Sequence, residues 1–171
     1  MSNKKLKIIG NSSKITVAGI TDIPAKTDTG AEFSSIWASD IAMTDDHKIQ
    51  FCLFAPGNPL YTGEKITVED FKAISVRNST GQEHIRYRVK LPAVIRGKKM
   101  RAYFTLADRS RNNFPVLIGR RTLKGRFLVD PSKLAVPYPA READTSLNDE
   151  LKADPKAFHQ KYISKSKPAQ N

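Results

Sequence analysis

Short apolar segments separated by turn residues place the strongest limit on what this chain can fold into. Segments rich in β-branched and aromatic residues alternate with clusters of Gly, Pro, Asn and Ser, which is typical of strands joined by tight turns. The predicted strands lie at residues 7–9, 15–18, 23–27, 33–37, 49–54, 71–76, 85–95 and 100–106. Helical periodicity is nearly absent before Arg120, so the sequence predicts an all-β fold, a small closed or partly closed barrel.

Three of the predicted turns have a definite sequence signature. Residues 10–13, Gly-Asn-Ser-Ser, are expected to connect two strands as a hairpin. Residues 77–82 contain Asn78 and Gly81, which tolerate positive φ, and predict the tip of a long hairpin. Residues 96–99, Arg-Gly-Lys-Lys, predict a further hairpin turn.

The character of the sequence changes after residue 130. Pro131, Pro137 and Pro139 are expected to break regular structure, and the remainder is rich in Lys and poor in aliphatic residues. We expect one domain over residues 1–135 and a basic tail over residues 136–171 that is partly helical or disordered. A short helix is expected to begin near Ser146 and to be interrupted at Asp154-Pro155.

The charge balance favours an acidic partner. The 171 residues include 29 Lys and Arg against 17 Asp and Glu, a formal charge of +12. Such a surface suits nucleic acid, an anionic surface or an acidic peptide, although it also serves solubility. The single cysteine, Cys52, excludes an internal disulfide and fits a reducing compartment. No run approaches the roughly 20 apolar residues of a membrane helix, so we expect a cytoplasmic protein with no membrane partner.

The strongest candidate for chemistry is Asp28-Thr29-Gly30, which follows the strand predicted at residues 23–27. Gly30 lets the backbone turn tightly, and the Thr29 hydroxyl can stiffen the loop by bonding the backbone, so Asp28 is presented at a strand end. Alone, Asp-x-Gly usually marks an ordinary turn. Residues 114–120, however, form an apolar run that ends in Gly-Arg, far downstream.

Together the two segments resemble the retropepsins, the single-domain aspartic peptidases of retroviral type. The longer pattern joins Ala-Lys-x-Asp-Thr-Gly-Ala-x-x-Ser-Ser to Thr-Leu-x-Asp-Arg and Pro-Val-Leu-Ile-Gly-Arg-Arg. It is similar to a bacterial branch labelled ATP-dependent zinc proteases, which includes the RimB-type proteins linked to a ribosomal glutamate ligase. The resemblance covers roughly residues 5–130. It implies an acid-protease barrel with one short helix at residues 120–124, closed by Gly125.

The resemblance also implies the roles of individual residues. Catalysis falls to the loop residues Asp28, Thr29 and Gly30. Substrate contacts fall to Ala31 and to a hairpin tip made of Asn78, Ser79, Thr80 and Gly81. Structural support falls to Glu32, Leu117, Ile118, Gly119 and Arg120. Glu32 stands where viral enzymes carry an Asp, and is expected to reach Arg120. The hairpin is either a flap that closes over substrate or a plain exposed hairpin.

Hydrolysis of a peptide by carboxylates needs a base for water and an acid for the leaving amine. Two carboxylates sharing one proton supply both. The chain has one Asp-Thr-Gly, and retropepsins obtain the second from a two-fold homodimer, with Thr29 expected to bond across the axis. Within a monomer, Asp108 would be the first candidate for the partner acid. The histidines are scattered and no phosphate-binding glycine loop is found, so neither a metal nor ATP is expected as cofactor.

Two functions follow from these observations. The first is an aspartic endopeptidase that works as a homodimer on peptides or proteins, including acidic or glutamate-extended protein tails. The second is a catalytically silent, basic β-barrel module that binds RNA, the ribosome or an acidic protein. The paired motifs favour the peptidase, and the charge and Lys-rich tail favour the binding module.

Overall fold

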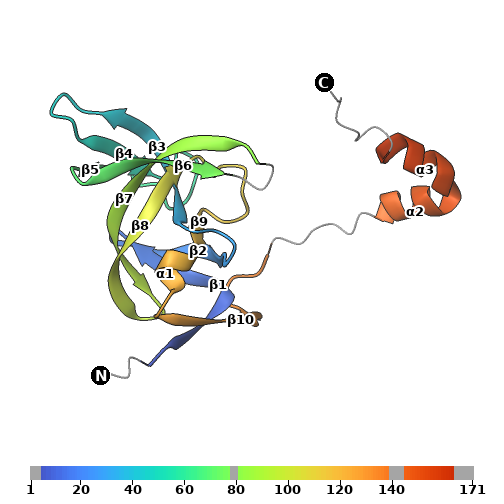
Figure 1. The fold of residues 1–171 in the computed structure, drawn as a ribbon, viewed down its shortest axis with the longest axis horizontal. Coiled ribbons are helices and arrows are strands. Elements are labelled where there is room, and N and C mark those ends of the chain that lie inside the picture. Colours follow the sequence, from blue (N-terminus) through green and yellow to red (C-terminus); the bar gives the residue numbers. More distant parts are fainter. Residues whose placement is uncertain (1–4, 78–80, 139–144, 164–171) are drawn as a thin grey trace. The chain divides into compact units, whose positions relative to one another are not determined.

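The computed structural model describes residues 5–77, 81–138 and 145–163, and divides the chain into two units, residues 1–137 and 138–171 (Figure 1). The described part of the first unit contains ten strands and one short helix. The strands are β1 Lys7–Val17, β2 Ile20–Thr27, β3 Ser34–Met43, β4 Ile49–Leu53, β5 Lys65–Val68, β6 Phe71–Arg77, β7 Glu83–Ile95, β8 Lys98–Ala107, β9 Val116–Ile118 and β10 Phe127–Leu134. The helix is α1, Arg120–Leu123. The second unit contains α2, Thr145–Ala153, and α3, Pro155–Tyr162.

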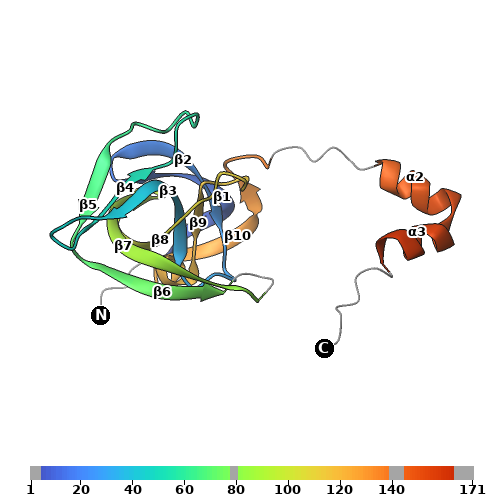
Figure 2. The same ribbon diagram turned by 90° about the horizontal axis from the view of Figure 1, so that it is seen from above.

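Six strands of the first unit close into a ring. Their order is β1-β2-β9-β3-β8-β7, and β7 pairs back onto β1 (Figure 2). The remaining strands attach outside this ring: β10 to β1, β6 to β7, and the β4–β5 pair to β3. The prediction of an all-β barrel with one short helix is therefore confirmed. None of the helices among the described residues has the length and apolar character needed to cross a bilayer.

The core fills the ring with alternate residues of its strands. On β7, Val89, Leu91, Ala93 and Ile95 are buried, whereas the residues between them are more exposed. This alternation follows from the two-residue period of a strand, which turns every second side chain inward. Each fully buried aliphatic side chain contributes roughly 1.5–3 kcal/mol to folding, so the apolar alternation determines which face of each strand points inward.

The hairpin predicted at residues 10–13 is wrong. β1 runs without interruption through this segment, and the strand pairing shifts register between Gly10 and Ser12, as in a β-bulge. The backbone of Lys133 on β10 approaches so closely that a Cβ on Gly10 would overlap its carbonyl group. Glycine at position 10 therefore permits the close approach of β1 and β10, and residues 10–13 do not form the predicted turn.

The turn that does join the first two strands is Ala18-Gly19. Both residues have positive φ, 48° and 85°, and Val17 pairs directly with Ile20. A two-residue loop with two positive φ values matches the twist of an antiparallel hairpin.

The other predicted hairpins are confirmed. Arg96 and Gly97 turn the chain between β7 and β8 with φ of 49° and 72°. β6 and β7 pair antiparallel up to Arg77 opposite Glu83. Of the tip residues, Asn78, Ser79 and Thr80 lie outside the described residues, and Gly81 has φ of 83°.

The region after residue 130 contains more regular structure than expected. β10 continues through Pro131, which is tolerated because an edge strand leaves one row of N–H groups unpaired. In the second unit, α2 and α3 are separated at Asp154, whose side chain accepts a 2.9 Å hydrogen bond from the Ala157 N–H. Pro155 occupies the first turn of α3, where its missing N–H costs nothing.

Candidate active site

The Asp28 loop begins where β2 ends, beside the end of β9. β2 and β9 are parallel, and the Asp28 N–H donates a 3.0 Å hydrogen bond to the Ile118 carbonyl. Asp28 Oδ1 accepts from the N–H groups of Gly30 and Ala31, at 3.0 and 3.2 Å. Asp28 is half-buried, while Thr29 and Gly30 are exposed. The loop therefore holds one carboxylate oxygen in a fixed orientation at the surface of the barrel.

The apolar segment that ends at Gly119 supports the Asp28 loop by packing next to it. A Cβ on Gly119 would overlap the Phe33 carbonyl group and lie 2.8 Å from the Ser34 nitrogen, so only glycine fits. The Gly119 N–H donates to Ser34 Oγ at 3.1 Å, and Ser34 Oγ lies 2.7 Å from Thr122 Oγ1 on α1. These buried contacts lock α1 against the start of β3, directly after the loop.

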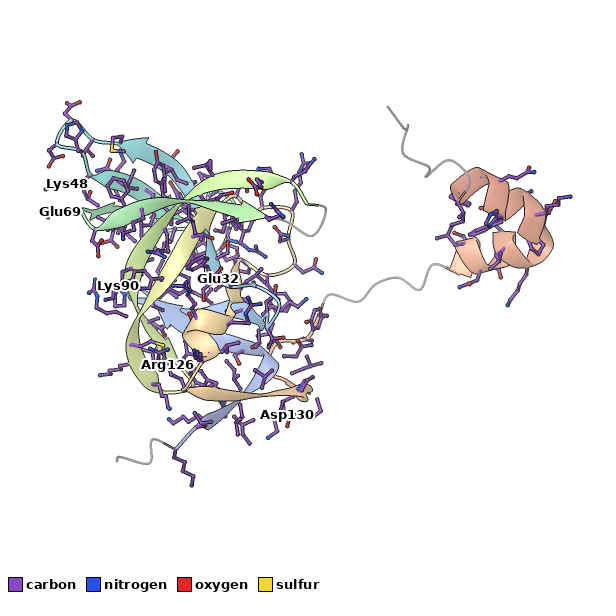
Figure 3. All side chains as sticks on the ribbon, viewed as in Figure 1. Glu32, Lys48, Glu69, Lys90, Arg126 and Asp130 are labelled. Carbon is purple, nitrogen blue, oxygen red and sulfur yellow. The ribbon has the colours of Figure 1, made fainter. Side chains whose placement is uncertain are left out.

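Two arginines at the start of α1 fasten the loop in different ways. Arg120 Nη1 donates to the carbonyl oxygens of Gly30 and Thr29, at 2.8 and 3.3 Å. Arg121 pairs with Glu32, with nitrogen–oxygen distances of 2.7 and 2.9 Å. Glu32 lies beside α1 (Figure 3).

The expected pairing of Glu32 with Arg120 is therefore wrong. The Arg121 N–H also donates to the Glu32 carbonyl at 3.1 Å, which brings the Arg121 side chain next to that carboxylate. Arg120 instead satisfies loop carbonyls that have no partner in a strand.

Arg109 is a site residue that sequence reasoning missed. It is only 9% exposed, and its Nε donates to the Phe114 carbonyl at 3.0 Å. Burial lowers the pKa of Arg109, the neighbouring charge of Arg86 lowers it further, and the charge of Asp28 opposes both. Burial also lowers the pKa of Arg86. The three charges are thus within electrostatic reach of one another.

Arg109 ends the motif Thr-Leu-Ala-Asp-Arg, in which Asp108 was the predicted candidate because only a carboxylate can serve as the second acid. Asp108 is exposed, and its Oδ1 accepts from the Ser110 N–H at 2.9 Å. That bond lowers the Asp108 pKa and engages its carboxylate within its own turn. Arg109, one residue later, is the buried member of the pair, and its Nε–H bonds the Phe114 carbonyl.

A basic stripe runs along one face of β7. Arg86, Arg88 and Lys90 alternate with residues that face the barrel, and all three are half-buried. The Arg88 guanidinium lies 4.7 Å from the Tyr103 ring centre and 5.3 Å from that of Phe33. Aromatic contacts of this kind hold an arginine in place without neutralising it.

The Asp28 carboxylate offers a group that can act as a base for water, whereas hydrolysis of a peptide needs an acid for the leaving amine as well. Within the ranges that the structure describes, no other carboxylate bonds to Asp28, and no three His, Cys, Asp or Glu side chains gather as a metal site would require.

Known proteins resemble this chain in sequence. Residues 8–138 match the RimB-like family, described as retropepsin-like aspartic endopeptidase RimB. A probable alpha-L-glutamate ligase of Desulfotalea psychrophila is 27% identical over 132 residues, which cover 74% of this chain and 28% of that protein. Another, of Shewanella halifaxensis, is 30% identical over 139 residues, which cover 78% of this chain and 30% of that protein. The chain thus spans less than a third of these relatives.

A solved structure shares the fold. The crystal structure of a Legionella pneumophila protein of unknown function matches with a TM-score of 0.55 and 22% sequence identity. The match covers 75% of this chain and 96% of that one. At this level of identity the match supports the architecture alone.

Proposed function

Because the chain belongs to the RimB-like family of retropepsin-like aspartic endopeptidases, we propose that it is an aspartic peptidase that works as a homodimer. The observation that carries the proposal is the Asp28 loop, in which two N–H groups hold Oδ1 and Arg120 fastens the loop carbonyls. A carboxylate oriented in this way needs little rearrangement before it acts on water.

A two-fold pairing of loops would complete the chemistry. Two Asp28 carboxylates close together cannot both ionise, so they share one proton and titrate as a pair. The ionised carboxylate removes a proton from water, whose oxygen attacks the peptide carbonyl carbon. The pair then carries two protons, and it gives one of them to the leaving amine as the C–N bond breaks, which leaves the pair with a single proton as at the start. The exposed Thr29 and Gly30 are free to meet the partner loop.

We further propose an acidic peptide or a glutamate-extended protein tail as substrate. The charge of the buried Arg109 interacts with Asp28, the charge of Arg86 interacts with Arg109, and Arg88 and Lys90 continue the basic stripe along β7. The proposal is supported by the names of relatives that contain a segment similar to this chain, which are probable alpha-L-glutamate ligases. Complementary charge of this kind raises the encounter rate with an acidic chain.

The test of the mechanism is the variant Asp28→Asn, which keeps the size of the side chain and removes its acid. We expect cleavage of glutamate-rich peptides to fall by at least about 10³-fold, since removing a catalytic base or nucleophile commonly has an effect of this order. The control is Asp45→Asn, an exposed aspartate in the turn between β3 and β4, which should leave the rate unchanged. Full activity in Asp28→Asn would contradict the proposal, as would activity that a chelator abolishes and zinc restores.

A second candidate function is binding without catalysis. A groove of about 430 Å³ beside α1 is lined by the basic residues Lys90, Arg101, Arg121, Lys124 and Arg126. Such a surface suits the phosphates of RNA. Binding of RNA that weakens steeply with salt, together with no cleavage of any peptide, would favour this function.

A further inference from the structure

Two buried polar atoms have no hydrogen-bond partner within the described residues: Ser35 Oγ on β3 and Arg88 Nε on β7. Ser35 is 5% exposed. In folded proteins about nine in ten buried polar groups are bonded, and an unpaired one costs roughly 1–3 kcal/mol. Unpaired donors that persist in a buried position are often completed by a molecule that binds there.

The two atoms belong to one row across the sheet. Ser35 stands opposite Thr105 of β8, and Thr105 stands opposite Arg88 of β7, so the three side chains share a face. Neighbouring strands lie about 4.8 Å apart, which separates the backbones of Ser35 and Arg88 by about 10 Å. The long side chain of Arg88 and a small anion can fill that distance.

The row begins beside the catalytic loop. Ser35 also pairs with Leu117 of β9, and the next residue, Ile118, accepts the hydrogen bond from the Asp28 N–H. Ser35 is therefore joined, through the β3–β9 pairing, to the strand end against which Asp28 is held.

The arginines in this place form no close ion pair, although the charge of Asp28 interacts with Arg109. Within the ion pairs of the described chain, none involves Arg86, Arg88 or Arg109. Glu32, on the loop beside Phe33, is held by Arg121. Burial without a carboxylate partner is the arrangement in which a guanidinium gains most from an incoming anion.

We propose that Ser35 and Arg88 seat a carboxylate side chain of the substrate and thereby select glutamate or aspartate near the cleaved bond. The proposal rests on the peptidase function above. Arg88 offers Nε–H and a neighbouring Nη–H, which can bind the two oxygens of one carboxylate side by side, and Ser35 adds a hydroxyl donor. An amide such as glutamine cannot satisfy these donors equally, because one of its two terminal groups is itself a donor.

The test compares a hexaglutamate with a hexaglutamine peptide at about 0.5 M salt, where long-range attraction is screened. Arg88→Met keeps an apolar stem against Phe33 and Tyr103 but removes the donors. We expect kcat/KM for hexaglutamate to fall about 10- to 100-fold, the size of one or two charge-assisted hydrogen bonds. The value for hexaglutamine should change less than about threefold, within the range of a substitution outside its contacts. Lys65→Met, an equal loss of charge at an exposed position of β5, should change neither.

Ser35→Ala provides a second variant that is expected to fold. Because the hydroxyl has no partner, its removal should leave the free energy of unfolding unchanged or raised, while cleavage of hexaglutamate falls about 5- to 10-fold. Equal losses in Arg88→Met and Lys65→Met, or a preference for glutamate that survives both Arg88→Met and Ser35→Ala, would overturn the proposal.

The same peptides are also titrated calorimetrically into Asp28→Asn protein. This measurement tests carboxylate binding by Ser35 and Arg88 separately from the peptidase mechanism. If the wild type cleaves no peptide, the peptidase function is refuted. The binding measurement then still tests whether Ser35 and Arg88 bind a carboxylate. The proposed carboxylate-binding role is supported if hexaglutamate binds more tightly than hexaglutamine and if this difference is lost when Arg88→Met is added. No preference for hexaglutamate, or a preference unaffected by Arg88→Met, refutes it.

Discussion

At the scale of single residues, two glycines have different structural roles: Gly30 lies in the Asp28 loop, and Gly119 lies in the segment that supports this loop. A Cβ on Gly30 would meet only Asp28 Oδ1, at 3.3 Å, so this position concerns the orientation of the carboxylate. A Cβ on Gly119 would overlap the backbone of Phe33, so this position concerns the packing of α1 against the barrel. The same residue type therefore serves the site in one place and the fold in the other.

We predict that Gly119→Ala lowers the free energy of unfolding by about 1–3 kcal/mol, because the backbone of Phe33 must move to admit a methyl group. Gly30→Ala should change stability by less than about 0.5 kcal/mol while it lowers peptidase activity. Urea denaturation and a peptide assay on both variants check this. If the two variants have the same free energy of unfolding, the close contact at Gly119 does not make a Cβ at this position destabilising.

At the scale of elements, the helical pair α2–α3 is held by polar contacts at its surface. Glu150 accepts from Lys161 Nζ at 2.7 Å and from the Tyr162 hydroxyl at 2.9 Å. Phe158 packs on Tyr162 with ring centres 4.7 Å apart. Both rings belong to α3, whereas the contacts of Glu150 join α2 to α3.

We predict that the pairing of α2 and α3 weakens in acid. The hydrogen bond from Lys161, and then that from Tyr162, lowers the pKa of Glu150 below its ordinary value. Because folding lowers the pKa of Glu150, the ionised carboxylate stabilises the helix pair fully above the unfolded-state pKa. This stabilisation is lost as the pH falls through the folded-state pKa. NMR shifts of α2 and α3 amides should therefore move toward random-coil values between about pH 5 and pH 3.

Glu150→Gln should show weakened pairing already at pH 7 and little further change in acid. An acid response of the wild type that the variant shares in full would assign the transition to another group.

At the scale of the whole molecule, the proposed homodimer needs a surface at which two Asp28 loops can meet. The Asp28 loop lies at a surface where Thr29 and Gly30 are exposed, and its own chain bonds no second carboxylate to Asp28 within the described residues. Completion by a second copy therefore requires loops to meet across a two-fold axis.

We predict that activity depends on pairing of chains. Mixing wild type with a tenfold excess of Asp28→Asn should place most wild-type chains in mixed dimers and remove most of the activity per wild-type chain, because each mixed site has one acid group. The same excess of Asp45→Asn should not reduce it. Light scattering across concentration should show the dimer. Full activity of wild-type chains in the Asp28→Asn mixture would mean that one chain suffices.

Local pattern by itself determined the β class, the hairpins at residues 77–82 and 96–99, the break between the tail helices and the position of the Asp-Thr-Gly loop. Each of these depends on residues close together in the chain: alternation in a strand, positive φ in a turn, a proline after a cap. The family resemblance also foresaw that Gly119 packs near this loop, because its two motifs carry a long-range pairing.

Only the tertiary structure decided that Gly10 lies in a strand and that Arg121 rather than Arg120 holds Glu32. It also decided that Ser35 and Arg88 stand in one row across the sheet and that the charge of Arg109 interacts with Asp28. These residues come from separate strands and a loop, and their neighbours depend on the register of pairing. A shift by one residue would turn Ser35 and Arg88 to the opposite face, and no local pattern sets that register. It is set by the closed ring as a whole, which buries one face of every strand at once.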